Sequence, residues 1–224
     1  LNQIGIDNSR VVNGIVNAAA GKISGATGVL VENEKKFNGG ISNAGSINAI
    51  TAGIELDKVA TFGGGITNSG KISGSSDFGI VIESVASFSG NVANTGTITG
   101  LLAGIAVLND STISGAISNA HKITVAGDGI VVAGTSSNSF DNSNVLKGIV
   151  NTGNISASGT GVLVEYETKF TGGISNAGAI TSHFSTGIYV HYVSTFAGGI
   201  TNSGAITAQA SGIDVDHTTT FAGG

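Results

Sequence analysis

The chain has 224 residues, a formal net charge of −5 and only 10% charged residues. A hydrophobic content of 40% combined with this low charge argues against disorder, because disordered chains are rich in charge and poor in β-branched residues. No basic cluster is longer than Lys35-Lys36, which argues against nucleic-acid binding, and the chain has no cysteine for a disulfide or a thiolate metal site. No apolar run approaches the roughly 18 residues of a transmembrane helix, so we expect no membrane insertion by this segment.

Three phrases recur in a fixed order along the chain. Each unit opens with an apolar anchor, such as Phe37, that is followed four residues later by Ile or Val. An Asn-x-Gly-x-Ile phrase comes next, as from Asn43 to Ile47, and a Gly-Ile/Val-x-Val/Leu/Ile phrase closes the unit, as at Gly53. The anchors are Val11, Phe37, Phe62, Phe88, Ile113, Val145, Phe170, Phe196 and Phe221.

The spacing of the anchors predicts a solenoid. From Phe37 to Phe221 successive anchors are 25, 26, 25, 32, 25, 26 and 25 residues apart, and a fixed period between about 20 and 50 residues is typical of solenoids. The apolar positions alternate as in Ile54-Glu55-Leu56, which indicates strands rather than helices. We therefore predict an all-β fold, a single right-handed parallel β-helix over residues 1–224, with about eight coils of three short strands each.

One step in the spacing is longer than the others. Its seven extra residues fall in "AGTSSNSFDNSN", residues 133–144, which we interpret as a loop inserted into one coil. Just after it, Lys147 occupies a position where the other coils have an inward-facing glycine or its equivalent. Either the Gly-Gly pair is a bend that interrupts strand alternation, or this coil is locally distorted.

Glycine and asparagine mark the corners of the predicted coils. We expect glycine there because tight turns between strands often need a positive φ. One asparagine recurs at the same place in every coil, and stacked asparagines can join each coil to the next by side-chain hydrogen bonds. The predicted ladder consists of Asn17, Asn43, Asn68, Asn94, Asn119, Asn151, Asn176 and Asn202.

The repeat "GGI-x-N-x-G-x-I…GI-x-V" resembles the passenger regions of bacterial autotransporters, which are secreted β-helices of type V secretion. The resemblance covers essentially the whole chain but has no functional residues in its motif. It implies an extracellular or cell-surface location in a Gram-negative bacterium, and a structural or adhesive role through host-cell or bacterial surface molecules or through self-association. The chain begins and stops in mid-pattern, so we expect it to be a fragment of a longer passenger.

A column of polar residues follows the third strand of each coil. Its strongest part is Glu165, His191 and Asp216, which should lie about one strand spacing apart. One interpretation is a divalent-cation or acid/base site in which two carboxylates favour the charged form of His191. The other is a solvated corner where acids discourage edge association. Glu32, Asp57 and Glu83 form the other carboxylate group of this column.

An apolar column is predicted on the outer face of the third strand. It contains Leu30, Val81, Val131, Leu163 and Tyr189, and an exposed apolar stripe can mark an interaction surface. The alternative is that the inserted loop, with Phe140, covers Val131 and Leu163.

We expect no catalysis and no cofactor, because neither a G-x-S-x-G turn nor a phosphate-binding glycine loop is present. The rival prediction is a carbohydrate-binding or carbohydrate-processing β-helix, similar to a phage tailspike or a polysaccharide lyase or hydrolase. Its carboxylates would converge only in space and would leave no motif.

Overall fold

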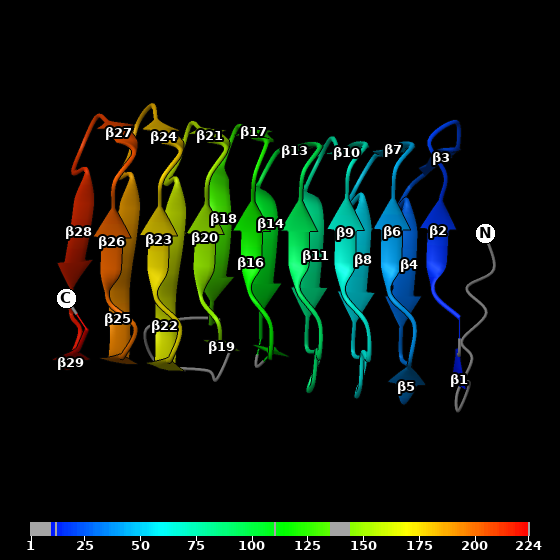
Figure 1. Ribbon diagram of the computed structural model, residues 1–224, viewed down its shortest axis with the longest axis horizontal. Coiled ribbons are helices and arrows are strands. Elements are labelled where there is room, and N and C mark those ends of the chain that lie inside the picture. The colour runs from blue at the N-terminus through cyan, green and yellow to red at the C-terminus, as the bar shows by residue number, and fades with distance from the viewer. Residues whose placement is uncertain (1–9, 12, 110, 135–143, 224) are drawn as a thin grey trace.

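A computed structural model describes residues 10–11, 13–109, 111–134 and 144–223 (Figure 1). They wind into a parallel β-solenoid of about eight turns with three strands per coil, which confirms the predicted β-helix. Nowhere in these residues is there a helix with the length and apolarity needed to cross a membrane. The chain advances along the long axis of the molecule one coil at a time, from the blue strands to the red ones in Figure 1.

Each of the three strand positions in a coil builds its own sheet. The first-strand sheet contains β2 (Ile15–Asn17), β6 (Ile41–Asn43), β9 (Ile66–Asn68), β12 (Val92–Asn94), β16 (Ile117–Asn119), β20 (Ile149–Asn151), β23 (Ile174–Asn176) and β26 (Ile200–Asn202). The second-strand sheet contains β3 (Lys22–Gly25), β7 (Ser46–Ala49), β10 (Lys71–Gly74), β13 (Thr97–Gly100), β17 (Lys122–Val125), β21 (Asn154–Ala157), β24 (Ala179–Ser182) and β27 (Ala205–Ala208).

The third-strand sheet carries the candidate site described below. It contains β4 (Val29–Glu32), β8 (Ile54–Asp57), β11 (Phe78–Glu83), β14 (Ala103–Leu108), β18 (Asp128–Ala133), β22 (Val162–Phe170), β25 (Ile188–Phe196), β28 (Ile213–Asp216) and, beside β25, β29 (Thr220–Phe221). Two short pairs lie at the anchor positions, β1 (Arg10–Val11) with β5 (Lys36–Phe37) and β15 (Thr112–Ile113) with β19 (Asn144–Val145).

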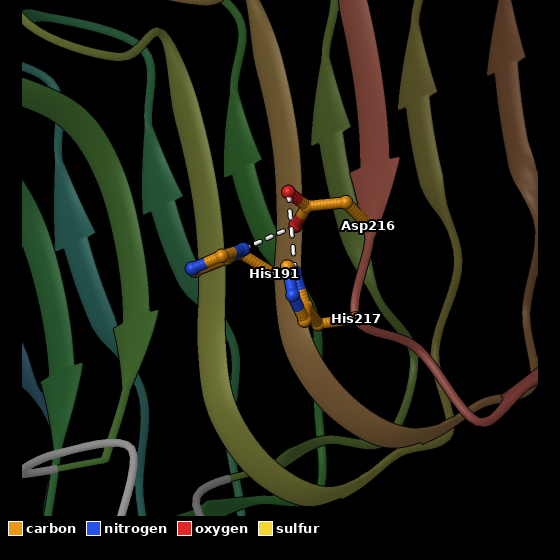
Figure 2. A group of neighbouring side chains, drawn as sticks. All are labelled: His191, Asp216 and His217. Atoms are coloured by element: carbon orange, nitrogen blue, oxygen red, sulfur yellow. Dashed lines mark hydrogen bonds and ion pairs between the residues drawn. The ribbon is translucent and has the colours of Figure 1, made fainter.

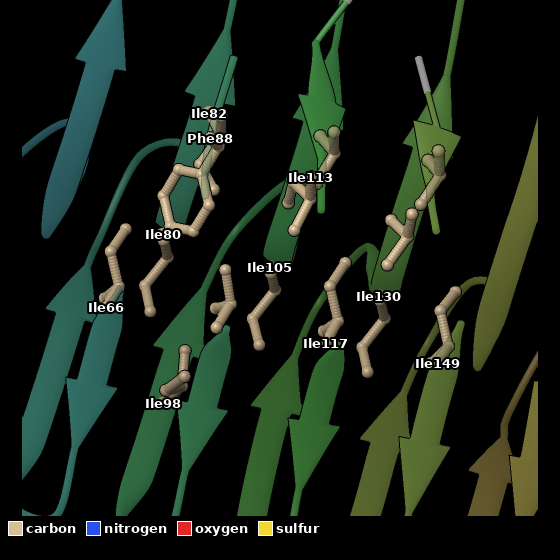
Figure 3. Packing of buried hydrophobic residues seen from close by; sticks show 14 of the residues in the cluster. Ile66, Ile80, Ile82, Phe88, Ile98, Ile105, Ile113, Ile117, Ile130 and Ile149 are labelled. Carbon is tan, nitrogen blue, oxygen red and sulfur yellow. The ribbon is translucent and has the colours of Figure 1, made fainter. Parts of the chain in front are cut away.

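The parallel register places equivalent residues of successive coils on top of one another. Ile72 pairs with Ile98, for example, so the inward aliphatic side chains form continuous columns. In Figure 3, Ile80, Ile105 and Ile130 of the third-strand sheet follow one another along the axis. These side chains are at most 1% exposed, and they form one hydrophobic core that runs through the described coils.

The phenylalanine anchors stack face to face inside the solenoid. The ring centroids of Phe37 and Phe62 are 4.9 Å apart at an interplanar angle of 3°, and those of Phe62 and Phe88 are also 4.9 Å apart, at 11°. This separation matches the spacing of neighbouring strands. A second stack begins at Phe170, because Ile113 and Val145 occupy the anchor position in between.

The asparagine ladder is complete. In each of its seven steps the Nδ2 of one asparagine donates to the Oδ1 of the asparagine in the next coil, at 2.7–2.8 Å. All of the amide groups therefore point the same way along the solenoid. From Asn43 to Asn176 the members are 1% exposed, so the ladder lies inside the molecule.

The expected positive φ does not account for most of the corner glycines. Among the described glycines, only Gly148, Gly199 and Gly223 have a positive φ. Most of the corner glycines are instead needed for close packing of the backbone. A Cβ on Gly64 would lie 2.4 Å from the carbonyl oxygen of Gly39, and one on Gly53 would lie 2.2 Å from Cγ2 of Ile72. Successive corners therefore approach too closely to accommodate a side chain.

Positive φ occurs instead at a corner that the sequence did not mark. The residue after the polar column of the third strand is left-handed in seven coils, with φ between 48° and 56° at Asn33, Lys58, Ser84, Asn109, Tyr166, Tyr192 and His217. Tyr166 and Tyr192 lie inside the long strands β22 and β25, which continue past this bend. This conformation is unfavourable for residues that carry a Cβ. The bend after the third strand is therefore strained.

A substitution at Ser84 can test this strain. Replacing Ser84, with its φ of 53°, by glycine should raise the free energy of unfolding by about 0.5–1 kcal/mol, because glycine tolerates the left-handed conformation. The measurement is chemical denaturation followed by circular dichroism. Ser73 lies inside β10, and the same substitution there should lower stability by about 0.5–1 kcal/mol. Equal effects at the two serines would contradict the strained corner.

Lys147 lies in a turn, which fits the interpretation of a bend that interrupts strand alternation. The backbone N–H of Gly148 donates to the carbonyl of Val145 at 3.0 Å, and the Lys147 side chain is exposed. In the other coils as well, no strand covers the residues between the anchor and the following Ile or Val, so alternation is interrupted there. Residues 135–143 of the predicted inserted loop, which include Phe140, lie outside the described residues.

Candidate functional site

The candidate site lies on the third-strand sheet, at the bend within β22 and β25 and at the end of β28. The register pairs Glu165 with His191 and His191 with Asp216, so the predicted carboxylate–imidazole–carboxylate column is present in space. His191 Nδ1 contacts Asp216 Oδ1 directly as a hydrogen bond and ion pair. Burial raises the pKa of Glu165, an effect that the charge of His191 partly offsets.

A fourth residue, His217, joins this column from the left-handed corner. Its Nδ1 lies 3.4 Å from Asp216 Oδ2, and Figure 2 shows His191 and His217 converging on the same carboxylate. In a regular strand the side chains of residues 216 and 217 would point to opposite faces. The φ of 48° at His217 breaks that alternation and brings both side chains to one side.

The hydroxyl of Tyr189 completes the group. Tyr189 Oη lies 2.9 Å from His191 Nδ1 and donates to Asp216 Oδ2 at 3.3 Å. Burial, supported by the negative charge of Asp216, raises the pKa of Tyr189 to about 12. Burial also acts to raise the pKa of Asp216, but the hydrogen bonds and charges of His191 and His217 outweigh it and hold that pKa below its ordinary value.

Aromatic rings extend the group along the corner. Tyr166 stacks on Tyr192 with centroids 5.5 Å apart, and Tyr192 lies 4.4 Å from the ring of His217. Because the rings of successive coils face one another, the central ring of Tyr192 has neighbours on both faces. These aromatic rings pack one coil against the next, so little of their faces is left for stacking on a sugar.

The donor atoms of this group suit a metal ion. In the described part of the chain, His191, Asp216 and His217 are the one group of three or more His, Asp or Glu side chains whose donor atoms all lie within 4.8 Å of one another. Asp216 is 39% exposed and His217 is 56% exposed, whereas His191 is only 16% exposed. The group is thus anchored on one side and open to solvent on the other.

The second carboxylate group of the column has local partners instead. Glu32, Asp57 and Glu83 lie in register on successive coils. Lys58 Nζ contacts Asp57 Oδ2 at 2.5 Å, and Asn109 Nδ2 donates to Glu83 Oε1 at 2.6 Å. These contacts fit a solvated structural corner and do not bring the three carboxylates to a common point.

The predicted apolar stripe is wrong as an exposed surface. Val81 is 2% exposed, and Val131 and Leu163 are each 8% exposed. They belong to a second hydrophobic cluster with Ala52, Ala103, Ala106 and Ala133, against which Phe78, Leu108 and the half-buried Tyr189 pack. The alternative expected Val131 and Leu163 to be covered, and they are buried, but residues 135–143 of the loop that it named lie outside the described residues. Leu30, at 38% exposed, is the one member of the stripe that remains open.

A shallow groove of about 500 Å³ crosses the corners between the first-strand and second-strand sheets. Its walls are mainly the small residues of the Asn-x-Gly corners, with Lys22 and Lys71 at its side. No cluster of catalytic or ligating groups faces it, so the site at Asp216 remains the candidate.

The sequence predicts the column Glu165, His191 and Asp216 but does not join Tyr189 and His217 to it. Alternation assigns Tyr189 to the apolar stripe, although it lies two residues before His191. The left-handed bend that brings His217 to Asp216 has no mark in the sequence.

Comparisons of the chain with models of known protein families, with curated proteins and with solved structures find no match in any of the three.

Proposed function

We propose that this chain is a structural and adhesive β-helix segment of an autotransporter-like passenger, displayed outside a Gram-negative cell. The observation that supports the proposal most directly is the uninterrupted asparagine ladder, which joins all eight coils by the same hydrogen bond. A rod built in this way can present its own outer surface at a distance from the cell that displays it. Its partners would be host-cell or bacterial surface molecules, or other copies of itself.

The proposal includes no catalytic role. The hydroxyl that contacts both His191 and Asp216 is that of Tyr189, and its pKa of about 12 disfavours the phenolate that a nucleophile would require. The buried stripe also removes one surface for self-association, so adhesion would use the small polar residues of the outer faces, such as Ser42 and Thr67.

Surface display tests the proposal. The chain is fused between a signal peptide and the membrane barrel of an autotransporter and expressed in a Gram-negative host. We expect protease added outside the cells to reach the chain, and we expect these cells to bind epithelial cells or one another more than cells with the barrel alone. Retention inside the cell, or display with no gain in adhesion, would contradict the proposal.

The rival carbohydrate function is tested on the purified chain. A glycan array followed by an assay for released oligosaccharide separates the two, because a structural segment should neither retain nor cleave a polysaccharide. Specific binding that is lost on replacing Tyr166 or Tyr192 by alanine would favour the rival.

A further inference from the structure

We propose that His191, Asp216 and His217 bind one divalent transition-metal ion of the Zn²⁺ class, which joins two adjacent coils of the solenoid. His191 belongs to β25, whereas Asp216 and His217 lie at the end of β28 and at the corner after it. One ion would therefore link neighbouring coils through side chains, in addition to the hydrogen bonds of the sheet. The inference is independent of the adhesive function proposed above.

The geometry brings three donor atoms to one point. Nδ1 of His191, a carboxylate oxygen of Asp216 and a ring nitrogen of His217 lie within 4.8 Å of one another. Ligand distances to Zn²⁺ are about 2.0–2.2 Å, so two donors of one ion can be up to about 4.4 Å apart. A rotation of the exposed His217 side chain would bring its nitrogen toward the ion. His191, which is 16% exposed, already directs its Nδ1 at Asp216 (Figure 2). Because two donors in direct contact are too close to bind the same ion, the partly exposed Asp216 carboxylate would also turn to admit the ion between them.

The donor set selects the class of metal. Two imidazole nitrogens and one carboxylate suit Zn²⁺ and its neighbours Ni²⁺ and Cu²⁺, whereas Ca²⁺ and Mg²⁺ prefer sites built from oxygen. The 39% exposure of Asp216 and 56% exposure of His217 leave room for water to fill the remaining coordination positions.

Tyr189 would support the site without binding the ion. Its hydroxyl donates to Asp216 Oδ2 at 3.3 Å and so orients the carboxylate. Glu165 lies beside His191 in the column, where its negative charge favours a cation. Groups in these positions typically change metal affinity by about 10–100-fold.

The test is calorimetric titration of the full chain, after removal of any affinity tag, with ZnCl₂ and separately with CaCl₂. We expect one Zn²⁺ per chain and no binding of Ca²⁺. H217Q and D216N should each weaken Zn²⁺ binding at least tenfold, and Y189F should weaken it about tenfold. Zn²⁺ should also raise the midpoint of thermal unfolding of the unaltered chain, since an ion that binds only the folded state stabilises it.

His183 and His121 supply the matched controls, because both are exposed and neither belongs to the group. H183Q and H121Q should bind Zn²⁺ as the unaltered chain does. His217 is 56% exposed, so H217Q should keep the circular dichroism spectrum of the folded solenoid. Absence of Zn²⁺ binding, or an equal loss of affinity in H183Q and H217Q, would overturn the proposal.

Discussion

Replacing Asn68 with alanine should lower the free energy of unfolding by about 3 kcal/mol. Asn68 Oδ1 accepts from Asn43 Nδ2, and Asn68 Nδ2 donates to Asn94 Oδ1, both at 2.8 Å. Nδ2 also donates to the carbonyl of Thr97 at 3.3 Å. Each lost hydrogen bond removes about 0.5–1.5 kcal/mol, and leaving the buried partners with fewer bonds adds to this cost. Chemical denaturation followed by circular dichroism measures the change.

Thr67 is the matched control for Asn68. It precedes Asn68 in β9, but its side chain is exposed on the outer face. T67A should change stability by less than about 0.5 kcal/mol. If T67A and N68A were equally stable, the ladder would contribute nothing to the fold.

Replacing Phe62 with alanine should lower the free energy of unfolding by about 3–5 kcal/mol. The Phe62 ring is 0% exposed and lies between the rings of Phe37 and Phe88. Alanine would leave a cavity that the regular backbone of the solenoid cannot fill by collapsing. The same denaturation experiment measures the effect.

Two further variants separate a general loss of packing from a specific need for stacked rings. F62I should retain part of the lost stability, because Ile113 already occupies the anchor position in another coil and is fully buried. Phe184 is 75% exposed, so F184A should change stability by less than about 0.5 kcal/mol. An effect of F184A as large as that of F62A would contradict the assignment of the core.

The coil architecture could be predicted because its cause is repetition. A period of 25 or 26 residues brings each anchor next to the previous one, so a residue such as Phe62 or Asn94 can be placed without knowledge of the turns between strands. The same reasoning placed His191 beside Asp216, since these two residues are 25 positions apart.

The features that repetition did not predict depend on backbone geometry and on local packing. Alternation predicts that residues 216 and 217 point to opposite faces, and only the left-handed φ of His217 brings them together. Alternation also placed Val131 on an outer face, but it did not predict that Val131 would pack into a second hydrophobic cluster. The glycines were recognised as corners for the wrong reason, because sequence does not separate a need for positive φ from a need for close approach.

The ladder also has a consequence for how such a molecule can vary in length. Asn119 and Asn151 are 32 positions apart instead of 25 or 26, yet their amides still meet at 2.8 Å. Extra residues are thus accepted at a bend, provided that the next asparagine returns to its place. Each amide needs only an identical neighbour above and below it, so whole coils could be gained or lost in evolution. Each such coil would change the length of the solenoid by about 4.8 Å and leave its cross-section unaltered.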